Sequence, residues 1–141
     1  VWVTQQWESD RAERALLLDE ASSFLESATV AFEAERRYVL LHRAESIRGT
    51  PEEPEFLAAL QLLDARGARL AIAIPEMNGD AERLRNVVYS LYQDLWEADW
   101  ADSLEERLEM QVSNFDQERE TYVRAALRLS HSDERLTTEN E

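Results

Sequence analysis

Residues 17–42 read LLDEASSFLESATVAFEAERRYVLLH, and apolar or small side chains recur in this stretch every three or four positions. Such spacing, sustained over more than three heptads, is typical of a long amphipathic helix. The stripe begins with apolar and small residues and later includes one carboxylate and one imidazole. Its members are Leu18, Ala21, Leu25, Ala28, Phe32, Glu35, Val39 and His42. The rest of the chain has to cover this stripe, which predicts a bundle of helices.

The composition fits a single folded domain. The chain has 141 residues, of which 44% are hydrophobic, and its three glycines and three prolines are too few for a β-rich fold with many turns. Thirty acids against fifteen bases give a formal net charge of -15, and every base is an arginine. An acidic surface of this kind repels phosphate backbones, so we expect no nucleic-acid partner.

Cysteine and membrane signals are missing from the sequence. Without cysteine, disulfides and thiol chemistry are excluded, and the redox compartment stays open. No apolar run approaches the length of a membrane span, about 18 residues, and the opening VWVTQQW lacks the pattern of a signal peptide. Because the sequence opens at Val1 rather than Met, we expect a segment of a longer protein, from which membrane spans could be missing. Trp2 and Trp7 fit either the interfacial belt of a helix leaving a bilayer or packing on a partner chain.

Capping signals define the first two helices. The first is predicted from Thr4 to Arg48, where Gly49 stands in the C′ position. Thr50-Pro51-Glu52-Glu53 then has the spacing of a capping box, with acids at the positive end of the helix dipole. This segment starts a second helix, which ends at Pro75.

The boundary between the third and fourth helices is weaker. We predict that Asp80 caps the third helix, but no glycine or proline follows Gly79. The hydrophobic seam changes phase at 99–102, and Ser103-Leu104-Glu105-Glu106 offers another capping box, so a fourth helix is predicted over 103–130. The preferred fold is an all-α, antiparallel up-down four-helix bundle with a long first helix. The alternative is one unbroken helix over 80–130, which gives three long helices that must dimerise.

The predicted domain covers residues 1–130. Within it, residues 1–10 could form a stalk that projects beyond the bundle. Residues 131–141 hold a single leucine and cannot bury a face, so we expect a polar tail or linker there.

Two features have both a packing and a functional interpretation. Gly67 interrupts the bulky face of the second helix, which favours close helix approach over space for a ligand. Trp96 and Trp100 close the third helix, and we expect them to pack in the core, with a dimer contact as the alternative.

Polar residues within the seams are the candidate ligand-binding groups. In an up-down bundle, Glu35 would face residues 64–67 of the second helix and Gln111 of the fourth. Arg119 enters the fourth seam opposite small residues, where its guanidinium could hold a carboxylate ligand. The alternative is an ion pair between Glu35 and Arg119, or between Asp64 and Arg66, or an Arg119 that reaches solvent. The candidate ligand-binding residues are therefore Glu35, His42, Asp64, Arg66, Gln111 and Arg119.

No metal or catalytic pattern is present in the sequence. Glu35 and His42 lie about 10 Å apart along the helix axis, too far for one metal ion to bind both easily. The Glu-x-x-His spacing of di-metal bundles, the nucleophile elbow and the glycine-rich phosphate loop are all missing. We therefore predict no metal, no cofactor and no enzymatic activity.

Residues 5–130 resemble the extracytoplasmic helical-bundle sensor domains of bacterial chemoreceptors and sensor kinases. The resemblance lies in an alanine-rich first helix leading to Ala34-Glu35-Arg36, a shorter second helix carrying residues 63–66, and a third helix that opens with Leu84-Arg85. It implies a ligand pocket between helices or across a homodimer interface, and signalling by small helix displacements toward a membrane. The polar tail departs from this pattern, because the last helix of such a domain normally runs straight into a membrane span.

Two functions are therefore predicted. The first is a non-enzymatic sensor module of a bacterial receptor, extracytoplasmic and homodimeric, which binds a small polar or anionic ligand. The second is an acidic helical adaptor, in the cytoplasm or elsewhere, that binds a protein partner. A sensor needs a cavity at its polar layer, whereas an adaptor fills that layer and exposes a contiguous apolar patch.

Overall fold

The computed structural model describes the backbone of residues 2–42, 46–97 and 104–139, and the side chains of 8–9, 11–42, 46–97 and 105–130. The elements are α1 (Trp2–Leu41), α2 (Glu53–Ala73), the short 3-10 helix η1 (Pro75–Met77), α3 (Asn78–Trp96) and α4 (Leu104–Glu139). The predicted all-α bundle of four helices is confirmed. The alternative of one unbroken helix is wrong, because α3 ends at Trp96 and Glu97 has extended backbone.

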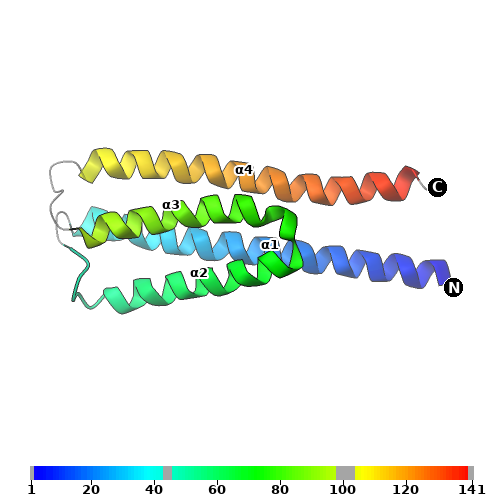
Figure 1. Cartoon of the computed structure of the whole chain (residues 1–141), viewed down its shortest axis with the longest axis horizontal. Helices are drawn as coiled ribbons and strands as arrows, with labels where there is room; N and C mark the ends of the chain where they lie inside the picture. The colour runs from blue at the N-terminus through cyan, green and yellow to red at the C-terminus, as the bar shows by residue number, and fades with distance from the viewer. Residues whose placement is uncertain (1, 43–45, 98–103, 140–141) are drawn as a thin grey trace.

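The four helices lie along one axis, and each runs in the direction opposite to the one before it (Figure 1). η1 joins α2 to α3 at the end of the bundle where both ends of the chain lie. α1 and α4 continue past this turn, whereas α2 and α3 stop there. We call the parts of α1 and α4 beyond the turn the two arms.

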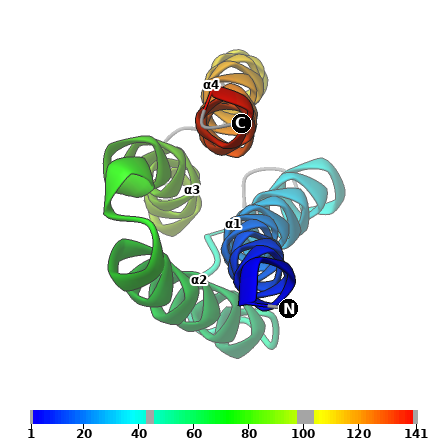
Figure 2. The same cartoon turned by 90° about the vertical axis from the view of Figure 1, so that its right-hand side faces the viewer.

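α1 is the helix that joins the bundle together. It packs against α2, α3 and α4, while α2 and α4 do not contact each other in the part of the chain that the structure describes. The end view in Figure 2 shows α2 and α4 on opposite sides of the molecule. The packing of α2 and α4 into one body therefore depends on α1 and α3.

The buried stripe of α1 is broader than the predicted seam. Glu35 and several apolar members of that seam are buried, but Leu18 is 41% exposed and Leu25 is half-buried. The stripe also includes residues that the seam omitted, namely Phe24, Ser27, Ala31 and Tyr38. The reason is geometric, because a face that contacts three neighbours must be wider than a seam that contacts one.

Aromatic side chains hold α4 against α1. The Tyr122 hydroxyl donates a hydrogen bond of 2.7 Å to the carbonyl oxygen of Ala21, and its ring centroid lies 5.6 Å from that of Phe24. Further along, the rings of Phe32 and Phe115 stack with centroids 4.2 Å apart. Because the helices are antiparallel, these contacts set which residues of α1 and α4 lie at the same level.

α2 comes close to α1 at Gly67. A side-chain carbon on Gly67 would lie 3.3 Å from Cε2 of Phe24, which is tighter than an ordinary contact. Phe24 is completely buried and packs beside Tyr122, so its ring has little room to move. The absence of a side chain at Gly67 therefore fits the close-approach interpretation.

The turn between α1 and α2 is tied to the end of α3. Ile47 is completely buried, and its N–H donates a hydrogen bond of 3.1 Å to the carbonyl oxygen of Leu95. The Ser46 hydroxyl donates a bond of 3.0 Å to the carbonyl oxygen of Trp96. The prediction that the first helix reaches Arg48 is wrong, because residues 46–50 leave the helix to make these contacts, with Gly49 at φ 69°.

Other predicted helix ends also differ from the structure. α2 begins at Glu53 without a side-chain cap, and the Thr50 hydroxyl instead bonds the carbonyl oxygen of Ile47 at 2.7 Å. α3 begins at Asn78, so Asp80 lies in its first turn, where it pairs with Arg83. α4 continues to Glu139, so most of the predicted polar tail is helical.

Replacement of Gly67 by leucine tests the close approach of α2 to α1. The side chain introduced by Gly67→Leu must displace the buried Phe24 ring, and overpacking of this kind typically costs about 1–3 kcal/mol of unfolding free energy. The control Ala68→Leu alters an exposed neighbour on the same helix and should change stability by less than about 0.5 kcal/mol. Urea denaturation of both variants measures the difference, and equal effects would contradict the packing described at Gly67.

Candidate functional site

Glu35 lies in the middle of the buried stripe of α1 and is 1% exposed. Neither of its carboxylate oxygens has a hydrogen-bond partner among the described residues. Burial raises the pKa of Glu35 well above its ordinary value of 4.5, because a charged carboxylate is costly away from water. The core therefore holds a carboxyl group that favours its neutral form.

Aromatic rings lie on both sides of Glu35 along α1. One turn before it, Phe32 stacks on Phe115, and one turn after it, Tyr38 meets Phe56 edge to face at 5.6 Å. Glu35 of α1 therefore lies at about the same height along the bundle as Phe56 of α2. The prediction that Glu35 faces residues 64–67 is wrong, because Gly67 lies much further along α1, against Phe24.

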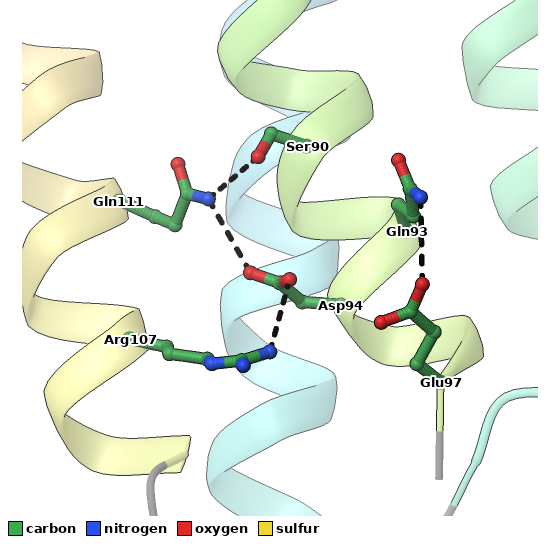
Figure 3. Close-up of polar contacts among 6 residues, drawn as sticks. All are labelled: Ser90, Gln93, Asp94, Glu97, Arg107 and Gln111. Carbon is green, nitrogen blue, oxygen red and sulfur yellow. Dashed lines mark hydrogen bonds and ion pairs between the residues drawn. The ribbon is translucent and has the colours of Figure 1, made fainter. Parts of the chain in front are cut away.

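Gln111 is the other buried polar residue of this layer. It lies one turn before Phe115 on α4, and thus at about the level of Glu35. Figure 3 shows its amide nitrogen donating to Ser90 Oγ at 2.8 Å and to Asp94 Oδ2 at 3.3 Å. Arg107 pairs with the other carboxylate oxygen of Asp94 at 3.5 Å. The Gln111 side chain therefore joins α4 to α3, and its amide nitrogen is bonded to the protein's own groups.

Asp64 and Arg66 lie away from this layer and do not pair with each other. Asp64 accepts hydrogen bonds of 2.6 Å from both Arg85 and Tyr89 of α3. Burial would raise the pKa of Asp64, but these two bonds outweigh it, so the pKa is lowered. Arg66 donates to the carbonyl oxygen of Ser23 at 3.0 Å. Both residues therefore connect α2 to its neighbours.

His42 and Arg119 are separated from the polar layer as well. The His42 ring stacks on Tyr38 with centroids 4.7 Å apart, and its Nε2 lies 3.8 Å from a carboxylate oxygen of Glu52. Arg119 is exposed on α4, so the prediction that it enters the buried seam is wrong. Of the six predicted ligand-binding residues, the structure brings only Glu35 and Gln111 to one level.

A pocket of about 270 Å³ lies where the two arms leave the bundle. α1 contributes Arg14, Leu17, Leu18 and Ala21, the α2–η1 turn contributes residues 73–77, and α4 contributes Ala126, Leu129 and Ser130. The sequence reasoning missed this pocket. The sequence feature that could have indicated it is a set of small residues from three segments of the chain, namely Ala21, Ala73 and Ala126.

A second hollow, of about 350 Å³, lies on the surface of α3 and is lined by Tyr89, Tyr92, Gln93 and Trp96. The Arg48 guanidinium lies over the Trp96 ring, 4.8 Å from its centroid, and the ring is half-buried. Burial, followed by the negative charges of Glu53 and Glu35, raises the pKa of Tyr92. Trp96 thus packs at the edge of the core, and Trp100 lies outside the described residues.

Comparisons with protein-family models, with curated proteins and with solved structures found no match to this chain. Across the described ranges no helix is long and apolar enough to cross a membrane. Among the same residues, no three histidine or acidic side chains gather where they could hold a metal ion.

The unpartnered carboxyl group of Glu35 gives a pH-dependent stability. Its raised pKa means that the folded state binds this proton more tightly than the unfolded state. The stabilisation of the folded state that comes from this bound proton is therefore fully present below pH 4.5. It is lost as the pH rises through the folded-state pKa of Glu35. We expect Glu35→Gln, which stays neutral, to be more stable than the wild type at neutral pH, with the difference shrinking toward pH 4.

Urea denaturation of both proteins across the acidic to neutral range measures this difference. The slope should approach about 1.4 kcal/mol per pH unit in the titrating interval. The exposed Glu109→Gln is the matched control and should show no such trend. A stability difference between Glu35→Gln and wild type that is independent of pH would contradict the assignment.

Proposed function

We propose that this protein is a sensor module that binds a small molecule in the pocket between α1, α4 and the α2–η1 turn. The observation that carries the proposal is the position of that pocket, at the point where both arms leave the bundle. A molecule bound there contacts the two helices whose arms extend away from the body. Binding would therefore change how one arm sits relative to the other.

The chemistry of the lining indicates the class of ligand. Most lining side chains are apolar, and polar groups come from Arg14, Glu76 and Ser130. A volume of about 270 Å³ is slightly below the range typical of small-molecule sites, about 300–1,000 Å³, so the ligand must be small. A guanidinium favours carboxylates, which it can bind through two parallel hydrogen bonds. The ligand that fits best is a small carboxylate with an apolar body.

Signal transmission requires that the ligand bind one arrangement of the arms better than another. The body of the bundle supports such a change, because the turn at 46–50 is hydrogen-bonded to α3 at the opposite end. Because the helices are fixed at that end, a displacement of α1 and α4 caused by the ligand would occur mainly at the end that holds the arms. The proposal involves no catalytic step and no cofactor.

The setting is the one that the sequence resemblance implies. We assign the module to the extracytoplasmic part of a bacterial membrane receptor, with the membrane tether outside the given residues. A cytoplasmic location is the alternative. The placement of both arms at one end of the bundle supports the receptor setting, because both helices can then pass a displacement in the same direction.

The second candidate function is an acidic adaptor that binds a protein partner. Two observations favour it. The amide nitrogen of Gln111 is bonded to Ser90 and Asp94, so the protein's own groups use this donor of the polar layer. The aromatic hollow on α3 offers a surface for a partner.

Binding of straight-chain carboxylates tests the sensor proposal. The purified chain is titrated with hexanoate, octanoate and decanoate, and with octanol as the uncharged analogue, and thermal unfolding is recorded. A carboxylate at a hundred times its dissociation constant should add about 2.7 kcal/mol to the unfolding free energy, and octanol should add less.

Two variants locate the site. Arg14→Ala should remove most of the preference for carboxylate over alcohol, and Ala126→Phe should block binding of both by filling the pocket. Arg37→Ala is the matched control, because it removes an exposed arginine of the same helix that does not line the pocket. If no carboxylate shifts the transition, or if Ala126→Phe binds as well as wild type, the adaptor becomes the better explanation.

A further inference from the structure

The hollow on α3 is walled by aromatic rings that follow one face of the helix. Tyr89, Tyr92 and Trp96 stand three and four residues apart, and Gln93 completes the lining of about 350 Å³. All three aromatic side chains are half-buried, and the rings of Tyr92 and Trp96 lie 6.3 Å apart with a tilt of 32°. The hollow therefore presents aromatic surface to solvent, near the end of the bundle opposite the arms (Figure 1).

Two of these rings already bind guanidinium groups of this chain. The central carbon of the Arg48 guanidinium lies 4.8 Å from the centroid of the Trp96 ring, and that of Arg85 lies 4.7 Å from the centroid of the Tyr89 ring. An arginine within about 6 Å of an aromatic face is attracted by the negative charge of that face and stacks on it. Tyr92 stands between these two rings along the helix. The face thus has the chemistry that binds arginine.

Acidic side chains lie beside the hollow. Glu97 accepts a hydrogen bond of 3.4 Å from the side-chain amide of Gln93 (Figure 3). Burial and then the negative charge of Glu53 raise the pKa of the Tyr92 hydroxyl, so this charge acts at the ring from the start of α2. On a chain with a net charge of -15, such acids attract a cationic partner.

The arginines at the hollow do not cancel its negative charge. Arg85 is paired with Asp64, since its Nε lies 2.6 Å from a carboxylate oxygen of that residue. Arg48 adds one positive charge, against two negative charges from Glu53 and Glu97. The hollow therefore combines aromatic faces with an excess of carboxylates, which is the combination that a guanidinium group requires.

The shape of the hollow indicates a peptide rather than a free small molecule. All four lining residues belong to α3, so an occupant is covered from one side only. Small-molecule sites bury about 70–90% of the ligand surface, which one helix face does not provide. A side chain of a peptide does not need such enclosure, because the rest of the peptide contacts the acidic surface around it. Tyrosine, tryptophan and arginine are also the residues that contribute most to protein interfaces.

We propose that this hollow is a docking site for a polypeptide segment that presents arginine side chains, with one guanidinium stacked on Tyr92 and attracted by the carboxylates of Glu53 and Glu97. The inference is independent of the pocket between the arms, which lies at the other end of the bundle. It also fits the receptor setting, because the hollow is far from the end at which the arms would lead to a membrane.

Fluorescence anisotropy with labelled peptides and the full chain tests the proposal. The probe is a six-residue peptide of alternating arginine and glycine. Two comparison peptides carry lysine, or the uncharged arginine analogue citrulline, in place of arginine. The arginine peptide should bind, the lysine peptide should bind at least about threefold more weakly, and the citrulline peptide should not bind. Equal affinity for the arginine and lysine peptides would show general attraction to an acidic surface and would overturn the proposal.

Three variants locate the docking site. Tyr92→Leu keeps an apolar side chain but removes the ring, and it should weaken binding of the arginine peptide by about fivefold. Glu53→Gln should also weaken binding, whereas the matched control Glu109→Gln, which removes an exposed acid of α4, should have little effect. Ala126→Phe, which fills the pocket between the arms, should leave peptide binding unchanged.

Circular dichroism and thermal unfolding establish that each variant folds. A folded Tyr92→Leu that binds the peptide as well as wild type overturns the proposal, and so do equal losses from Glu53→Gln and Glu109→Gln. If Tyr92→Leu does not fold, the comparison of these two glutamine variants decides.

Free methylguanidinium tests the source of the guanidinium group. It should fail to displace the arginine peptide when both are present at the same concentration, because it is covered from one side only. Displacement at that concentration would identify a small-molecule site and would overturn the assignment to a polypeptide.

Discussion

The packing of α1 against three neighbours at once is the constraint on which the rest of the structure depends. α2 and α4 do not touch within the described residues, so α1 and α3 alone hold them in one body. A helix with three neighbours needs a wide buried face. α1 provides it with small residues such as Ala28 and Ala31, which let the neighbours approach, and with Phe24 and Phe32, which fill the space toward α4. Even a methyl group at Gly67 would press against Phe24, because α2 lies close to α1 at this point.

The spacing of apolar residues predicts the buried face of a helix best where that helix has few neighbours. On α2 the regular three- and four-residue spacing of apolar side chains predicts one face, which is buried apart from a half-buried Gly67, since the core lies on one side of that helix. The members of this face are Phe56, Leu60, Leu63, Gly67, Leu70 and Ile74. For α1 the same reasoning included Leu18 and omitted Phe24 and Tyr38, because a heptad seam describes contact with one partner. On α4 it placed Arg119 in the core by extending the seam at regular steps. The structure leaves that arginine in solvent, whereas Tyr122, the next member of the same predicted seam, is buried.

The candidate site was harder to predict than the fold, because it depends on the levels at which helices meet. Burial of Glu35 and Gln111 followed from their places in the seams, and both are in the core. The residues that surround Glu35 and Gln111 cannot be predicted from those seam positions. α1 ends at Leu41, and the turn that follows buries Ile47 against the end of α3, which sets the level of α2 along α1. Asp64 consequently lies about two turns away from the level of Glu35 and pairs with Arg85 of α3. Such an offset is decided by a tertiary contact of the connecting turn, which no helical periodicity records.

Stability is distributed unevenly along the bundle. At the end with the 46–50 turn, hydrogen bonds from Ile47 and Ser46 fasten the chain to α3, and Gln111 links α3 to α4. In the same region the buried carboxyl group of Glu35 opposes the packing of α1, because neither of its oxygens is bonded. The stack of Phe32 on Phe115 and the bond from Tyr122 to Ala21 then hold α1 to α4 up to the pocket. Beyond that point the two arms have no cover from α2 or α3. A ligand that contacts α1 and α4 at this boundary binds where the two helices are least firmly held together. A ligand at the level of Glu35 would instead have to move helices that the surrounding core holds in place.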